Sequence, residues 1–224
     1  MGKTVNILKL KPTQFAVGML EVDLRINKLA KIRKSKVRSL AAESPIPVIV
    51  SPKGNLYILD HHHLLFVFYH LGIKKVRIKI VMDLRAAKMS YFKFWRWMCH
   101  HSYYYPYCQF GEGPRKPLYL PRDIRGLADD PYRGLAWVVR KIGAYKNNGN
   151  KFAEFKWANF FRSKGLLDRH GLMKLPHALK KAVSLAQSRS ARKLPGYIGP
   201  IHNHKKIRKN IKRLLEKLED VLTV

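Results

Sequence analysis

The spacing of hydrophobic and polar positions predicts a sheet region in the first third of the chain. Residues 46–50 and 56–60 are short apolar, β-branched runs on either side of a Gly-Asn turn, which predicts a β-hairpin. Residues 61–72 are almost wholly apolar after three histidines and end in Gly72, which predicts a short buried helix. In residues 74–84 apolar residues alternate with Arg and Lys, as expected of a half-buried strand.

The rest of the chain has mostly helical periodicity, with apolar residues recurring every three or four positions. A turn at Gly18 is expected in residues 12–24, and the Tyr-, Pro- and Gly-rich residues 102–121 read as a loop. In the last predicted helix the bases come first and the acids last, which opposes the helix dipole, so its apolar stripe must dock on the body or on a partner. The predicted helices span residues 25–40, 86–101, 129–145, 151–165, 174–187 and 204–224.

The net charge of the chain indicates a globular protein that binds an anionic partner. There are 45 Lys and Arg against 14 Asp and Glu, a formal net charge of +31, while 46% hydrophobic residues are enough to bury a core. The partners that suit this charge are nucleic acid, an anionic membrane or a nucleotide phosphate, and a merely basic surface is the alternative. We expect nucleic acid to be bound by the basic helix, through Lys31, Arg33, Lys34, Lys36 and Arg38.

The cysteine count and the N-terminal residues bear on the compartment. Cys99 and Cys108 are the only cysteines, so a disulfide framework is not expected. The first 18 residues lack the continuous apolar stretch and cleavage site of a secretory signal. No run approaches the roughly 20 apolar residues that a spanning helix needs. A cytoplasmic protein is therefore expected, and the oligomeric state is left open.

The residues with the most distinctive chemistry are Asp60, His61, His62 and His63, where a predicted strand ends and a helix begins. Backbone N–H groups at a helix N-terminus attract phosphate, and here they would belong to residues 61–64, including Leu64. The imidazoles add donors, and the carboxylate of Asp60 suits a magnesium ion. The alternative is a capping aspartate followed by surface histidines.

At this point the sequence resembles a known group of proteins, the ParB/sulfiredoxin superfamily and, within it, the family of ParB-like nucleases. The resemblance covers roughly residues 5–200, and its matching pieces are residues 12–24, 45–72, 76–84 and 120–162. It implies an α+β fold with a small curved mixed sheet and a helical C-terminal half. The expected domains are an α/β core at residues 1–101, a helical extension packed on it at 102–200, and a basic amphipathic helix at 201–224.

The resemblance also implies that the turn at Asp60–His63 binds the phosphates of a nucleotide or of nucleic acid. The ParB-like serine kinases carry Asp-Gly-His-His-Arg here, so His61 replaces a glycine and Leu64 replaces an arginine. The missing arginine removes a bidentate phosphate contact and weakens the case for nucleoside triphosphate binding. The sulfiredoxin reaction is disfavoured as well, because this turn holds no cysteine.

Kinase relatives use an acid ahead of the first helix as general base, and Glu21 is the residue that best matches it. The resemblance thus gives Glu21, Asp60, His62 and His63 as candidate catalytic residues, with Glu21 and Asp60 as candidate magnesium ligands. The alternative for Glu21 is a surface acid paired with Arg25, four residues later.

Three functions follow from these features. The first is nucleic-acid binding through phosphate contacts, with metal-dependent phosphodiester hydrolysis. The second is a nucleotide-dependent phosphotransferase or nucleotide hydrolase that takes ATP or another nucleotide at the Asp60–His63 turn. The third is a non-catalytic interaction module.

Two further features have a structural and a functional interpretation each. The aromatic residues of 92–107 are interleaved with bases and suit either stacking on unpaired nucleotides or anchoring of core and loop. Asp129 and Asp130 suit either a metal or, more simply, the cap of the helix that Pro131 opens.

Overall fold

The computed structural model describes residues 3–167, 175–200 and 204–222, with side chains at 205–218 in the last of these ranges. Within these ranges the chain forms two compact units. The first contains Met1–Val17 and Arg25–Asp129, and the second contains Gly18–Leu24 and Asp130–Val224, apart from the residues outside the described ranges.

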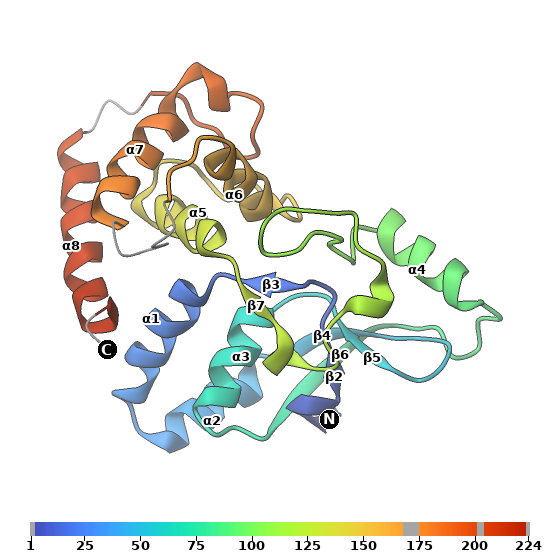
Figure 1. Cartoon of the computed structure of the whole chain (residues 1–224). Helices are drawn as coiled ribbons and strands as arrows, with labels where there is room; N and C mark the ends of the chain where they lie inside the picture. The colour runs from blue at the N-terminus through green and yellow to red at the C-terminus, as the bar shows by residue number, and fades with distance from the viewer. Residues whose placement is uncertain (1–2, 168–174, 201–203, 223–224) are drawn as a thin grey trace. The chain divides into compact units, whose positions relative to one another are not determined.

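The first unit is built on a curled, mixed five-stranded sheet in the order β1-β6-β4-β5-β2 (Figure 1). The strands are antiparallel from β1 to β6, parallel from β6 to β4, antiparallel from β4 to β5, and parallel from β5 to β2. This confirms the α+β class with a small mixed sheet. The strands are β1 (Thr4–Asn6), β2 (Leu10–Lys11), β4 (Ile46–Val50), β5 (Leu56–Ile58) and β6 (Lys75–Asp83).

The predicted hairpin of β4 and β5 is present and forms the centre of the sheet. Ser51 closes its turn twice, because its N–H donates to the carbonyl of Asn55 at 2.8 Å and its hydroxyl accepts from the N–H of Asn55 at 3.1 Å. Gly54 supplies the positive φ of 78° that the turn requires. The β-branched residues of β4 are buried, so burial and local turn chemistry specify the same structure.

Strand β6 follows its predicted alternation only at the start. Val76 and Ile78 are buried as expected, but Ile80 is exposed. The register between β4 and β6 shifts beyond the pair of Val48 and Ile80, so that Ile49 lies opposite Met82 and one residue of β6 is extra. Ile80 precedes this bulge and is still in regular register, so the bulge does not account for its exposure, and Val81 and Met82 beyond it are exposed as well.

The single basic helix expected at residues 25–40 is instead two helices. Helix α1 (Met19–Ala30) starts directly after Gly18, and α2 (Lys34–Glu43) follows a break in which Arg33 has extended backbone geometry. The buried residues lie at 20–22 in α1 and at 37 and 41 in α2, with largely exposed positions between them. The first group belongs to the second unit and the second group to the first unit, so the two groups are buried in different units.

Two other helices of the first unit match the sequence pattern. Helix α3 (His62–His70) buries the apolar run after β5, and α4 (Tyr91–His100) starts at Ser90, whose hydroxyl accepts from the N–H of Lys93. Residues 102–129 also cluster with this unit. One reason is that Tyr104 packs with Phe15 and Trp95 in its core.

The second unit is a helical cluster around Tyr145 and Trp157, whose rings stack at 4.2 Å. Asp130 caps α5 by accepting from the N–H of Arg133, and Gly143 ends it with a φ of 95°, which confirms the predicted cap. The helices are α5 (Pro131–Ile142), α6 (Ala153–Ser163), α7 (Leu175–Gln187) and α8 (His204–Leu222).

Helix α8 docks on this cluster through its apolar stripe, as its charge order requires. Ile207 and Leu218 are buried in the core of the second unit, and Ile211, Leu214 and Leu215 pack against it. The side-chain amide of Asn210 adds a hydrogen bond of 2.9 Å to the carbonyl of Ile142. Val221, which the sequence placed on the same stripe, lies beyond the described side chains. The two units are divided after Val17, Leu24 and Asp129. The domains expected at residues 1–101, 102–200 and 201–224 stay a prediction.

Candidate functional site

The predicted phosphate-binding turn joins β5 to α3 in the first unit. His61 is the N-cap of α3 and has a φ of 72° and a ψ of 22°, the left-handed region that favours glycine. This backbone geometry suits the glycine that the ParB-like serine kinases carry at the position of His61. The side chain of His61 makes no capping hydrogen bond to the helix. The turn therefore presents the start of α3 without a side-chain cap.

Asp60 is exposed and ionised at this turn. Its side chain is 77% accessible, its Oδ1 accepts from the N–H of His61 at 2.6 Å, and its Oδ2 lies 3.6 Å from Nδ1 of the same residue. The hydrogen bond with the His61 side chain lowers the pKa of Asp60 to about 2, against an opposing effect of burial and with help from the backbone N–H. The carboxylate is thus available to a cation at neutral pH, and it repels a phosphate placed beside it.

His62 is turned into the protein. It is 5% exposed, and its Nε2 accepts a hydrogen bond of 3.2 Å from the backbone N–H of Thr13. The hydroxyl of Thr13 donates to the carbonyl of Ile58 at 2.6 Å, so Thr13 links the segment after β2 to both β5 and α3. The geometry gives His62 a positioning role at the start of α3. His63 is only half-buried.

We expect His62→Ala to destabilise the first unit by about 2 kcal/mol, because a buried ring is lost and the N–H of Thr13 keeps no partner. The matched control is His63→Ala, which removes a half-buried imidazole of the same helix turn and is expected to cost well under 1 kcal/mol. Chemical denaturation of both variants measures this difference. Equal free energies of unfolding would show that the contact between His62 and Thr13 contributes nothing.

Glu21 belongs to the second unit, whereas Asp60–His63 belongs to the first. It lies in the first turn of α1 and is 4% exposed, so it is not the surface acid of the alternative interpretation. Burial alone would lower the pKa of Arg140, but the charges of Glu154 and Glu21 contribute to raising it. A common site of Glu21 with the Asp60–His63 turn stays a prediction.

The second unit compensates its buried acids with arginines, a network that the sequence did not reveal. Arg140 donates from Nε to Glu154 at 2.8 Å, and the guanidinium of Arg133 lies 3.5 Å from the centre of the Phe155 ring. Arg162 donates to Oδ1 of Asp130 at 2.7 Å. Burial raises the pKa of Asp130, and this outweighs the lowering effect of Arg162. Asp130 is therefore a helix cap and an ion-pair partner.

The predicted nucleic-acid contacts form an exposed basic segment in the first unit, which we call the α2 basic segment. It runs from the end of α1 into the first turns of α2, whose first turn contains no acidic residue. Bases at a helix N-terminus oppose the helix dipole by about 0.3–1 kcal/mol each, so a bound anion would relieve this repulsion. All five members are exposed, namely Lys31, Arg33, Lys34, Lys36 and Arg38.

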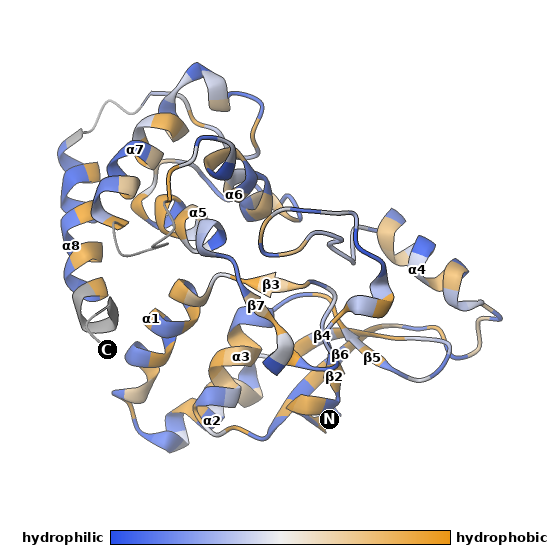
Figure 2. Cartoon of the chain, in the orientation of Figure 1, coloured by the Kyte–Doolittle hydropathy of each residue, from blue (hydrophilic) through white to orange (hydrophobic). Residues whose placement is uncertain are grey.

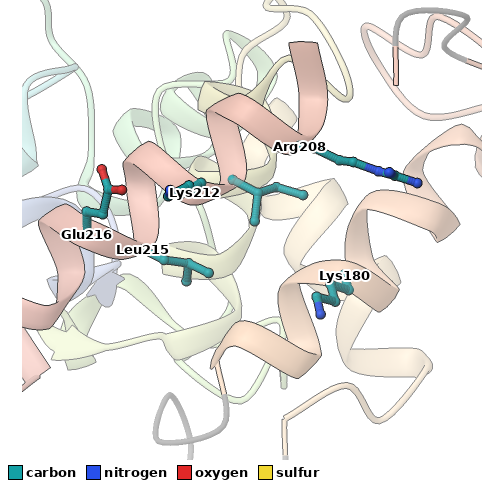
Figure 3. A pocket seen from close by; sticks show the side chains of 6 residues that line it. Lys180, Arg208, Lys212, Leu215 and Glu216 are labelled. Carbon is teal, nitrogen blue, oxygen red and sulfur yellow. The ribbon is translucent and has the colours of Figure 1, made fainter. Parts of the chain in front are cut away.

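A groove of about 550 Å³ lies between α7 and α8 in the second unit (Figure 3). Its apolar floor comes from Ile211 and Leu215, and Lys180, Arg208, Lys212 and Glu216 complete its lining. None of the predicted site residues lines this groove. It is a feature of the C-terminal helices, separate from the turn at Asp60–His63.

The described residues offer a metal ion single carboxylates rather than a cluster of ligands. Within them, no three His, Cys, Asp or Glu side chains gather into a metal-binding group. Magnesium is commonly held by one or two carboxylates together with water and substrate phosphates, and the exposed carboxylate of Asp60 fits that role.

Over the same described residues, no helix has the length and apolar character to cross a membrane.

Comparisons with known proteins agree with this fold. Residues 3–163 match the family model described as "Putative ParB-like nuclease". The chain is also similar to the crystal structure of protein Atu1540 from Agrobacterium tumefaciens, at 35% identity and a TM-score of 0.80, over 90% of this chain and 98% of that chain. No curated protein matches the sequence. Since the family model covers well over half of the chain, the protein belongs to the ParB-like nuclease family.

Proposed function

We propose that this protein binds nucleic acid through phosphate contacts and hydrolyses phosphodiester bonds at the Asp60–His63 turn. The observation that carries the binding part is the α2 basic segment, five exposed bases within eight residues and inside the region that matches the family. Contacts between such bases and phosphates supply affinity without sequence specificity. The net charge of +31 adds long-range attraction to any polyanion.

The hydrolytic part rests on the family and on the chemistry of the turn. The positive end of the α3 dipole attracts a phosphate, and the half-buried His63 lies in its first turn. Asp60 would hold a magnesium ion, which neutralises the carboxylate and polarises a phosphoryl oxygen when bound. His62 would fix the orientation of the helix start through Thr13 rather than touch the substrate.

The test is binding and cleavage of a fluorescent oligonucleotide by the full chain, with magnesium or with EDTA. We expect binding in both conditions, weaker at higher salt, and cleavage with magnesium only. Absence of binding at low salt would contradict the whole proposal. Binding without cleavage under any metal condition would leave a binding protein and contradict the hydrolytic part.

The variant Asp60→Asn tests whether the phosphate binds at the Asp60–His63 turn or at another place on the protein. In EDTA we expect this variant to bind the oligonucleotide about two- to fivefold more tightly, because an exposed negative charge beside the phosphate is removed. With magnesium we expect cleavage to fall at least 100-fold, because the ligand of the metal is lost. Measurements of affinity by anisotropy and of cleavage by gel give both values.

The matched control for this substitution is Asp83→Asn, which removes another exposed carboxylate of the first unit, one held by Arg85 at 2.6 Å. It changes the net charge equally and should leave cleavage as it is. If Asp60→Asn and Asp83→Asn behave alike in both assays, the turn at Asp60–His63 does not bind the phosphate.

A further inference from the structure

Helix α4 presents an outer face on which aromatic and basic side chains are combined. Phe92, Arg96 and His100 follow each other at intervals of four residues and are all exposed, Phe92 at 78%. Residues four apart share a face of a helix, so these three form one stripe. Lys93, Trp97 and His101 form the neighbouring stripe at the same spacing. In Figure 2 most of α4 is orange, with hydrophilic residues in its middle part.

Phe92, Lys93 and Arg96 are exposed and lie outside the core of the first unit, whereas the half-buried Trp97 packs against it. The inner face of α4 is formed by Phe94, Trp95 and Met98, which are buried. The ring of Trp95 lies 5.0 Å from that of Tyr57 and 5.2 Å from that of Tyr104, in edge-to-face arrangements. This one buried face is enough to hold α4 against the first unit. Phe92 contributes little to this packing and forms an exposed aromatic pair with Tyr91, whose ring centre lies 5.7 Å away.

The second stripe holds its rings in order before any ligand is present. His101 lies 4.3 Å from Trp97 and is nearly parallel to Tyr103, with a 10° angle between planes and 5.8 Å between centres. Its Nδ1 lies 2.9 Å from the carbonyl of Trp97, which fixes the imidazole against the helix. Rings that are already ordered lose little freedom when a flat ligand stacks on them.

The charge around this face favours a polyanion. The sequence contains no acidic residue between Asp83 and Glu112, and Lys93 and Arg96 are exposed on α4 itself. A helix that carries no acid of its own and presents the exposed Phe92, the half-buried Trp97, two fixed positive charges and two imidazoles is complementary to unpaired bases joined by phosphates. A duplex hides the faces of its bases, whereas a single strand offers them.

We propose that the outer face of α4 is a stacking surface for single-stranded nucleic acid, with Phe92 and Trp97 contacting bases and Lys93 and Arg96 contacting phosphates. This inference rests on the proposed nucleic-acid binding and specifies the form of its partner. The α2 basic segment would contact the backbone of single strands and duplexes alike, and α4 would give single strands an additional affinity.

The experiment measures the affinity of the full chain for an oligothymidylate of about 20 nucleotides and for a duplex of equal length. We expect Phe92→Leu to weaken binding of the single strand about tenfold and to leave the duplex unchanged, because leucine keeps the hydrophobic contact but has no π face. Phe92→Trp should keep the affinity of the single strand. The control is Phe110→Leu, at another exposed phenylalanine outside α4, which should change neither affinity.

Three results would overturn the inference. They are an unchanged single-strand affinity in Phe92→Leu, an equal loss for single strand and duplex, and an equal loss in Phe110→Leu. Full retention in Phe92→Leu would indicate that the exposed ring serves a hydrophobic contact with a protein. Failure of the proposed function gives a different result from failure of this inference, because the unmodified chain would then bind neither the single strand nor the duplex.

Discussion

Replacing Gly196 by alanine should destabilise the second unit by about 3–5 kcal/mol, which is a large part of the stability of a typical domain. Gly196 has a φ of 74°, and a Cβ added there would lie 1.8 Å from the carbonyl oxygen of Lys146. The two residues are already joined by a hydrogen bond of 2.9 Å from the N–H of Lys146 to the carbonyl of Gly196. The clash is with backbone, so it can be relieved only by separating the two segments.

The same chain offers a control that separates the clash from the backbone conformation. Gly199 also has a φ of 74°, but no atom lies within 4 Å of the position that its Cβ would take. Gly199→Ala should therefore cost only about 1–2 kcal/mol, the price of a left-handed conformation for a residue with a side chain. Chemical denaturation of the two variants measures the difference. Equal losses would show that the approach of Lys146 to Gly196 does not stabilise the unit.

Elements whose cause is local were predictable from the sequence. The β4–β5 hairpin, α3 and the capped start of α5 were all expected, because turn residues, an apolar run and an Asp-Pro pair act within a few positions. The docking of α8 was also expected, since its charge order is unfavourable for an isolated helix. In each case the short-range preference and the burial in the folded unit agree.

Features that depend on distant residues were not predictable. Ile80 is exposed although it continues the alternation of Val76 and Ile78, and nothing in the strand's own pattern indicates this or the register shift against β4 that follows it. The break between α1 and α2 depends on which side chains find buried positions, whereas the continuous basic pattern suggested a single helix. Hydrophobic periodicity describes one helix or strand at a time, whereas the burial of these residues also depends on the elements that pack against them.

The candidate site shows the same limit. The position of the turn at Asp60–His63 followed from the strand and helix that flank it, but His62 and His63 were equally candidates for catalysis. The structure separates them, because His62 is bonded to Thr13, which is 49 residues away. Arg140, which responds to the charge of Glu21, has no sequence signal that connects it to that residue. Such pairings are set by tertiary structure alone.

The α2 basic segment should account for most of the affinity for nucleic acid. If Lys31, Arg33, Lys34, Lys36 and Arg38 are all replaced by glutamine, we expect binding of a duplex at about 0.1 M salt to weaken by about 1,000-fold. Each phosphate contact contributes about 0.9 to the slope of log affinity against log salt concentration, so the slope should fall by about 4. Anisotropy titrations at several salt concentrations give both quantities. The unfolding free energy should not fall, because the substitutions reduce repulsion between exposed charges.

A matched variant distinguishes this interface from a general effect of charge. Helix α8 lies outside the region matched by the family and carries more than five exposed bases. The variant replaces five of them, namely Lys205, Arg208, Lys209, Lys212 and Arg213. Their replacement by glutamine removes the same five charges, so it lowers the long-range attraction equally. Because direct phosphate contacts would remain, we expect less than a tenfold loss and a nearly unchanged salt slope. An equal loss in both variants would mean that the affinity follows net charge alone, and the interface would then not lie at α2.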